Sequence, residues 1–180
     1  MMKQSPEIIS RKRLYRGTML SVYEYEVQLD GKTLRREIIE RRPGVAVVPI
    51  DRKHNVLLVK EYYAGSNSFL YALPGGSLES DADPECEAMR ELREETGHSA
   101  ERFIKLHYTY SRPAISTRKS YTFLAYNLAW DPLPDSDDFI EVVKLPLEEA
   151  IQLTYQDFES DTSTLGNLLM ARDKLRELAL

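Results

Sequence analysis

Residues 75–97 decide the fold, and they read GGSLESDADPECEAMRELREETG. The signals at the two ends of this stretch predict a helix over residues 84–96. Asp83 is placed to cap the helix N-terminus, and Pro84 takes the first turn, where a backbone N–H is not needed. Gly97 follows the last predicted residue, where a left-handed C-terminal cap favours glycine. Both ends of the helix are therefore marked in the sequence.

One face of the predicted helix is acidic. At about 100° per residue its glutamates fall together, and they are Glu87, Glu91, Glu94 and Glu95. Like charges three or four residues apart repel, whereas a divalent cation such as Mg²⁺ takes carboxylate and carbonyl oxygens and would reverse that cost. Arg90 lies four residues before Glu94 and is expected to orient its carboxylate. The stripe by itself leaves two interpretations open, a metal platform and a solvated helix face.

The opposite face of the helix is expected to pack on a sheet, because it carries Ala88, Met89 and Leu92. Cys86 lies beside these apolar residues, and we interpret it as a small core residue rather than a nucleophile. It is the single cysteine of the chain, so no intramolecular disulfide can form. A reducing compartment is therefore expected.

The composition is that of an acidic chain with the length of about one domain. Its 180 residues include 29 acidic and 24 basic ones, which gives a formal net charge of −5. This balance argues against a protein whose main task is coating nucleic acid or an anionic membrane. The N-terminus lacks an apolar signal core, and nowhere do about 18 apolar residues run together. We expect a soluble cytoplasmic protein with no nucleic-acid or membrane partner.

Strands and helices interleave along the chain without the regular alternation of a doubly wound sheet, which predicts a mixed α/β fold. The alternating pattern before Asp30-Gly31 and the Ile- and Arg-rich segment after it predict a β-hairpin over residues 18–42. Helices are predicted over residues 146–155 and 163–178. Further strands are predicted over residues 45–50, 56–61, 103–110, 119–130 and 139–145.

The same glycine-to-glycine stretch strongly resembles the Nudix box, G-x5-E-x7-R-E-U-x-E-E-x-G-U, in which U is apolar. The fixed positions that match are Gly76, Arg90, Glu91, Glu94, Glu95 and Gly97. Two positions depart from the pattern, because Ala82 stands at the first glutamate and His98 at the last apolar position. In the family that first glutamate supports the arginine of the box and the metal site. Asp81, Asp83 and Glu85 are the candidates to substitute for it.

The resemblance extends beyond the box to the ADP-ribose pyrophosphatase and ADP compounds hydrolase branch of the family, on residues 36–43 and 45–49. It implies a Nudix α/β/α sandwich with an N-terminal antiparallel β-hairpin extension. We therefore expect an N-terminal β extension over residues 1–43 and a Nudix hydrolase domain over residues 44–180. In that branch the extension exchanges contacts across a homodimer, so a homodimer is expected here.

The resemblance also implies the chemistry. Nudix enzymes use Mg²⁺ or Mn²⁺ to cleave a nucleoside diphosphate linked to another moiety, by attack of water on the pyrophosphate. Carried onto this chain, the expected reaction hydrolyses ADP-ribose or a related compound to AMP, or another nucleoside monophosphate, plus a sugar phosphate. The implied metal ligands are Glu91, Glu94, Glu95 and the carbonyl of Gly75. Arg90 would hold the glutamates in place, and it is counted with Glu94 among the catalytic residues.

A general base is expected in the acidic loop of residues 135–141, by analogy with the same branch. Glu141 is the first choice, with Asp138 and Asp137 as close alternatives, and a merely solvated loop ahead of a strand is the other interpretation. Arg36 and Arg41 are candidates to bind the ADP moiety, although edge-strand arginines also keep a sheet soluble. Tyr63, which stands where the branch often has arginine, is a further substrate-binding candidate.

Two other functions remain open from the sequence. Ala82 is compatible with a non-catalytic or altered nucleotide-binding module. A hydrolase that removes damaged nucleoside triphosphates fits the box equally well, but it leaves the N-terminal hairpin unexplained.

Overall fold

The computed structural model describes residues 5–79, 82–133, 140–156 and 160–180. The chain divides into two compact units. The N-terminal unit comprises Met1–Pro43 together with Thr109–Ser120, and the main unit comprises Gly44–Tyr108 together with Tyr121–Leu180. No helix of the described residues is long and apolar enough to cross a membrane.

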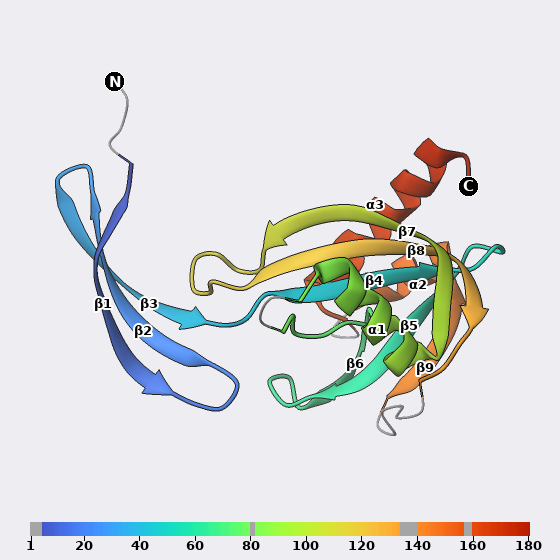
Figure 1. Ribbon diagram of the computed structural model, residues 1–180, viewed down its shortest axis with the longest axis horizontal. Coiled ribbons are helices and arrows are strands. Elements are labelled where there is room, and N and C mark those ends of the chain that lie inside the picture. The colour runs from blue at the N-terminus through green and yellow to red at the C-terminus, as the bar shows by residue number, and fades with distance from the viewer. Residues whose placement is uncertain (1–4, 80–81, 134–139, 157–159) are drawn as a thin grey trace. The chain divides into compact units, whose positions relative to one another are not determined.

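The N-terminal unit is a three-stranded antiparallel sheet in the order β1-β2-β3 (Figure 1). Its strands are β1 (Glu7–Arg16), β2 (Ser21–Leu29) and β3 (Lys32–Glu40). Asp30 and Gly31 have φ of 49° and 77°, the left-handed conformation that a two-residue hairpin turn requires. The predicted hairpin is thus confirmed as β2 and β3, while β1 adds a strand that the sequence did not predict. Ile39 of β3 also exchanges backbone hydrogen bonds with residues 115 and 117 of the same unit.

The main unit is built on a mixed sheet with strand order β6-β5-β4-β8-β7, in which β5 also pairs with β9. The strands are β4 (Gly44–Ile50), β5 (Asn55–Tyr63), β6 (Ser68–Ala72), β7 (His98–Tyr110), β8 (Lys119–Trp130) and β9 (Glu141–Pro146). The helices are α1 (Pro84–Thr96), α2 (Leu147–Thr154) and α3 (Thr162–Leu178). The predicted mixed α/β fold is confirmed, and β6 is the one strand of this unit that the sequence did not predict.

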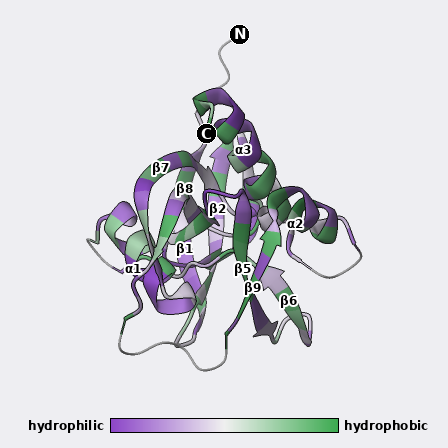
Figure 2. Cartoon of the chain, turned by 90° about the vertical axis from the view of Figure 1, so that its right-hand side faces the viewer, coloured by the Kyte–Doolittle hydropathy of each residue, from purple (hydrophilic) through white to green (hydrophobic). Residues whose placement is uncertain are grey.

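Two hydrophobic cores lie on opposite faces of this sheet, because side chains of a strand point alternately to its two sides. On β4, Val45 and Val47 pack with α1, whereas Val48 and Ile50 pack with α2 and α3. Figure 2 shows hydrophilic and hydrophobic residues on both strands and helices, as expected for elements with one buried face. The arrangement is an α/β/α sandwich, with α1 alone on one side.

The buried face of α1 is narrower than the sequence predicted. Ala88 and Leu92 are buried, but Cys86 and Met89 are exposed, so the interpretation of Cys86 as a core residue was wrong. Cys86 lies two residues before Ala88, which is about 200° around the helix and therefore away from the sheet. Glu87 and Glu91 are the other buried side chains of this part of the helix.

Candidate active site

Helix α1 presents the acidic residues, and both of its ends are fixed as predicted. The Asp83 carboxylate accepts hydrogen bonds from the backbone N–H groups of Glu85 and Cys86, each at 3.0 Å. At the other end Gly97 has φ of 70°, and its N–H donates to the carbonyl of Arg93. These caps hold the helix to its full length, so its glutamates keep fixed positions relative to one another.

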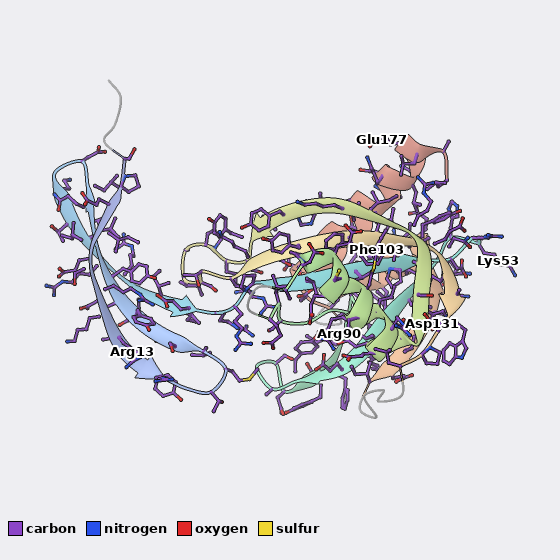
Figure 3. All side chains as sticks on the ribbon, in the orientation of Figure 1. Arg13, Lys53, Arg90, Phe103, Asp131 and Glu177 are labelled. Atoms are coloured by element: carbon purple, nitrogen blue, oxygen red, sulfur yellow. The ribbon has the colours of Figure 1, made fainter. Side chains whose placement is uncertain are left out.

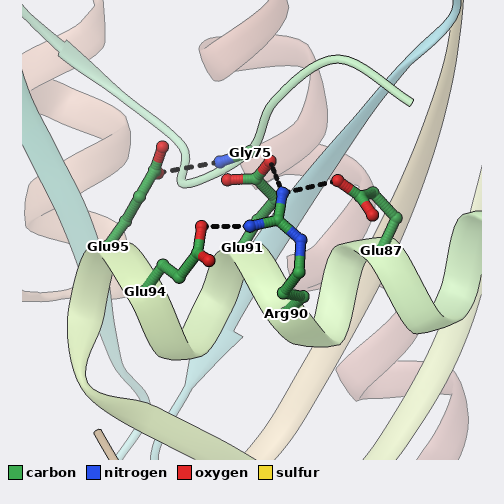
Figure 4. Close-up of polar contacts among 6 residues, drawn as sticks. All are labelled: Gly75, Glu87, Arg90, Glu91, Glu94 and Glu95. Carbon is green, nitrogen blue, oxygen red and sulfur yellow. Dashed lines mark hydrogen bonds and ion pairs between the residues drawn. The ribbon is translucent and has the colours of Figure 1, made fainter. Parts of the chain in front are cut away.

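Arg90 binds three carboxylates on one side of α1 (Figure 4). Its Nη2 donates to Oε1 of Glu87 at 2.5 Å and to Oε1 of Glu91 at 2.7 Å, while its Nη1 pairs with Glu94. Glu87 and Glu91 are only 7% and 8% exposed. One guanidinium therefore offsets three negative charges, two of which are buried.

The surroundings of Arg90 and Glu91 shift the pKa values of both side chains. Hydrogen bonding to Glu87 and then to Glu94 raises the pKa of Arg90 above its usual range, so this guanidinium stays charged. Burial raises the pKa of Glu91, and although Arg90 opposes the shift, the negative charges of Glu94 and Glu87 add to it. Because three carboxylates share this one guanidinium, a further cation beside Glu91 would be favoured.

The loop at Gly75 and Gly76 closes over the same face. The Gly75 N–H donates to Oε2 of Glu95 at 2.9 Å (Figure 4), and a Cβ at Gly76 would collide with the Glu91 carboxylate. Strand β4 holds the loop in place, because the N–H of Val45 donates to the Gly76 carbonyl at 3.0 Å and that of Val47 to the Pro74 carbonyl at 2.9 Å. Glycine at position 76 is therefore what lets the loop and the Glu91 carboxylate touch.

The donors gathered here fit a hard divalent ion. Glu91, Glu94, Glu95 and the Gly75 carbonyl supply only oxygen atoms, which Mg²⁺ and Mn²⁺ prefer. In the described part of the chain, no three His, Cys, Asp or Glu side chains already converge on a metal position. Glu94 instead pairs with Arg90, and Glu95 accepts a hydrogen bond from Gly75. The excess negative charge at Glu91 is the feature that an ion would offset.

Ala82, the first of the two departures from the box, has a packing role. It is half-buried and packs against the core cluster that contains Leu92. Of the three candidates to replace its carboxylate, Asp83 caps the helix, Glu85 is exposed, and Asp81 lies outside the described residues. Glu87 is the residue that binds Arg90 from the N-terminal side. Sequence reasoning placed Glu87 on this face but gave it no role, although its position three residues before Arg90 was a usable signal.

The other predicted residues of the main unit lie on β5 and β9. Glu141 is the first residue of β9, is exposed, and stands opposite Lys60 of β5. Asp138 and Asp137 lie outside the described residues. Tyr63 ends β5 and is 37% exposed. Desolvation raises the pKa of Tyr63, and the charge of Glu61 followed by those of Asp161 and Glu95 adds to the shift.

The two predicted substrate-binding arginines belong to the N-terminal unit. Arg36 is exposed, and its Nη1 donates to the backbone carbonyl of Arg35 at 2.7 Å. Arg41 follows β3, and its backbone N–H donates to Oγ1 of Thr117 at 3.2 Å. Both roles stay predictions.

Comparison with known proteins tests the resemblance of the sequence to the Nudix family. The NUDIX domain family model matches residues 40–164. An ADP-ribose pyrophosphatase of Bacillus subtilis (strain 168) is 31% identical over 149 residues, which cover 81% of this chain and 80% of that protein. A methanol dehydrogenase activator of Bacillus methanolicus is 27% identical over 161 residues, which cover 87% of each chain.

Among solved structures, that of an ADP compounds hydrolase matches the fold with a TM-score of 0.83. It covers 97% of this chain and 96% of its own, at 23% sequence identity. With the family model, the Bacillus subtilis relative and this fold in agreement, the chain belongs to the Nudix family, as a hydrolase of its ADP-ribose pyrophosphatase branch.

Proposed function

We propose that this chain is a Mg²⁺-dependent pyrophosphatase that hydrolyses ADP-ribose or a related nucleoside diphosphate-linked compound to AMP, or another nucleoside monophosphate, and a sugar phosphate. Mn²⁺ would serve in place of Mg²⁺. The observation that carries the proposal is the excess of carboxylates over Arg90 on α1, directly under the Gly75–Gly76 loop. The 31% identity to an ADP-ribose pyrophosphatase supports the substrate class.

In this proposal each residue has a defined task. Glu91, Glu94, Glu95 and the Gly75 carbonyl would hold the ion, which supplies positive charge against the pyrophosphate and lowers the pKa of a bound water. Arg90 keeps the carboxylates apart and aligned, because its two Nη atoms reach toward different glutamates. The buried position of Glu91 would strengthen its electrostatic interaction with a bound ion, because little water reaches it.

Glu141 is the proposed general base. Its carboxylate is exposed at the start of β9, so it is free to accept a proton from the attacking water. Asp138 and Asp137, which precede it in the acidic loop, are the alternatives. Arg36, Arg41 and Tyr63 are proposed to bind the nucleotide, the arginines through charge and Tyr63 by stacking.

The division of labour that we propose assigns residues 1–43 to homodimerisation and residues 44–180 to hydrolysis. The support is that β1 is exposed along its entire length and that β2 and β3 contain no fully buried residue. Among the described residues, the buried hydrophobic side chains begin at Val45. A sheet with no core of its own gains stability by pairing with a second copy.

Replacement of Glu95 by Gln tests the proposal. The variant loses a charged ligand, so turnover of ADP-ribose should fall below detection, while Glu85→Gln, an exposed change on the same helix, should leave it intact. Product masses from a panel of ADP-ribose, NADH, diadenosine polyphosphates, sugar nucleotides and nucleoside triphosphates identify the substrate. Undiminished AMP release by the Glu95 variant would refute the assignment of the site.

A nucleotide-binding module without hydrolysis is the second candidate. Ala82 favours it, and so does the similarity to a protein named as an activator of another enzyme. This alternative predicts stabilisation by ADP-ribose with no product at any Mg²⁺ or Mn²⁺ concentration. Multiple-turnover product formation by the unmodified chain would exclude it.

A further inference from the structure

A cavity of about 380 Å³ lies in the main unit among elements that contribute nothing to the acidic face of α1. Three segments enclose it: the turn between β4 and β5, the start of α2, and the last turns of α3. The turn is tied to α2, because the N–H of Leu147 donates to the His54 carbonyl at 2.9 Å. Two of the three segments are therefore held together by a backbone hydrogen bond.

The floor of the cavity is apolar and belongs to the core. Leu147 and Leu175 line it, and they are only 5% and 2% exposed. Both are members of the hydrophobic cluster between the sheet and the two C-terminal helices, against which Leu180 also packs. Because core side chains are closely packed, this floor is rigid and already formed. It offers an apolar surface to a ligand at no cost of reorganisation.

The rim of the cavity is basic. Lys53, Arg172 and Arg176 line it, and Glu148 is the one acidic side chain among its lining residues. Glu148 contacts both arginines only at 3.8 Å, and in the described part of the chain Lys53 has no ion-pair partner. Asp173 pairs with Arg172 at 3.4 Å and with Arg176 at 3.9 Å, but it is exposed and does not line the cavity. Among the side chains that line the cavity, three cations therefore stand against one carboxylate.

This concentration of positive charge is opposite in sign to the chain as a whole, which carries −5. It also contrasts with α1, where carboxylates outnumber the arginine that binds them. An anion without a metal is repelled by the α1 face and attracted to this cavity. Figure 3 shows Lys53 extending outward from the turn between β4 and β5.

We propose that this cavity is a binding site for a small organic anion, in which a carboxylate or phosphate group meets Lys53 and Arg176 and an apolar body covers Leu147 and Leu175. Ligand sites commonly combine an apolar lining with a few polar groups that fix the orientation. Charge-assisted hydrogen bonds from arginine and lysine to such anions are the strong contacts of the site.

Backbone amide shifts in NMR spectra of the ¹⁵N-labelled full chain test the proposal. Titrations are made in EDTA, so the outcome does not depend on metal-dependent hydrolysis. Phenyl phosphate and benzoate are the probes, and they separate a phosphate from a carboxylate. Phenol has the apolar ring without an anionic group, and inorganic phosphate has the anionic group without the ring. We expect saturable shifts for at least one of the two probes at His54, Leu147 and Arg176, and at least tenfold weaker binding of phenol and phosphate.

The double variant Lys53→Gln, Arg176→Gln removes two rim charges and should weaken binding of the responding probe about tenfold or more. Lys174→Gln is the matched control, because Lys174 lies on the same helix but outside the cavity, where its Nζ pairs with Glu177 at 2.8 Å. The single change Lys53→Gln serves if the double variant does not fold. Equal binding of phenol and phenyl phosphate, shifts confined to α1, or undiminished binding by the charge variants would overturn the proposal.

Discussion

Oε1 of Glu87 accepts a hydrogen bond from Nη2 of Arg90 at 2.5 Å, and this carboxylate is almost completely buried. The contact lies three residues along the helix, so it needs no movement of the backbone. It gives Arg90 a fixed partner on the N-terminal side, at the end of the helix where Ala82 has replaced a carboxylate. Glu87 is thus a carboxylate partner of Arg90 supplied by α1 itself, whereas Ala82 precedes the helix.

Replacement of Glu87 by Ala should therefore weaken metal binding. Outer partners of metal ligands are typically worth about tenfold to hundredfold in metal affinity or activity. Calorimetric titration with Mn²⁺ measures the affinity, and kcat at saturating metal measures the remaining catalysis. Glu87→Gln keeps an acceptor oxygen and should recover part of the loss, whereas Glu85→Ala, exposed on the same helix, should change nothing. An unchanged Mn²⁺ affinity in the Glu87 variants would contradict a positioning role.

The contact between Gly76 and the Glu91 carboxylate predicts a second effect. Gly76→Ala places a methyl group where the carboxylate lies, so Glu91 must move away from its position beside Arg90. Metal affinity and kcat should both fall, while the free energy of urea unfolding changes little because a side-chain end can move aside. Gly65→Ala is the control, because nothing lies within 4 Å of the added methyl group there.

Metal should stabilise the fold. An ion present at 100 times its dissociation constant adds about 2.7 kcal/mol to the free energy of unfolding. For a chain of this length that corresponds to a rise of roughly 5–10 °C in Tm. Melting curves in EDTA and in millimolar Mg²⁺ or Mn²⁺ measure it, and the double variant Glu94→Gln, Glu95→Gln should lose the rise. Identical melting with and without metal would count against these glutamates as ligands.

Asp51 predicts a pH-dependent contribution to stability. Burial alone would raise its pKa, but the ion pair with Lys144 at 2.6 Å and hydrogen bonds from Asn55 and Lys53 lower it well below the ordinary value. A lowered folded-state pKa stabilises the protein above the unfolded pKa of about 4 and loses that effect as the pH falls further. Asp51→Asn should cost about 1–3 kcal/mol at pH 7.

Urea unfolding at a series of pH values tests this sign. The difference in unfolding free energy between the wild type and Asp51→Asn should be constant from pH 7 to about pH 5 and shrink below about pH 4. Asp173→Asn, an exposed change on α3, is the control and should cost less than about 0.5 kcal/mol. A difference that grows on acidification would contradict the predicted direction.

The N-terminal sheet predicts the oligomeric state. Ile9 and Tyr15 of β1 are 52% and 58% exposed, so burial of the remaining surface of each in a dimer would contribute about 0.8–1.7 kcal/mol, roughly half the value for a fully exposed side chain. Light scattering should give twice the mass of one chain, and Ile9→Glu with Tyr15→Glu should raise the dimer dissociation constant at least tenfold. Met170→Glu, an exposed apolar residue on α3, is the control. A monomer at all concentrations would refute the assignment of this sheet to dimerisation.

The sequence predicted α1 to the residue because every signal at its ends is local: Asp83 and Gly97 act on neighbouring backbone groups. Strand β1 escaped prediction because Arg11, Lys12 and Arg13 interrupt any alternation of apolar and polar residues. The five residues of β6 are too few to establish a period. The acidic face was predictable from helical spacing, but the burial of Glu87 was not, because it depends on where the sheet and the glycine loop meet the helix.

Strand β4 carries side chains into both cores and also binds the glycine loop through the backbone of Val45 and Val47. Six of its seven residues are buried, so neither of its faces is open to solvent. In a library of single substitutions, this strand should therefore tolerate fewer substitutions than any other segment of the main unit. A polar replacement at Ile50 would destabilise the hydrophobic core between the sheet and helices α2 and α3. It would also disturb the strand that binds the glycine loop over Glu91.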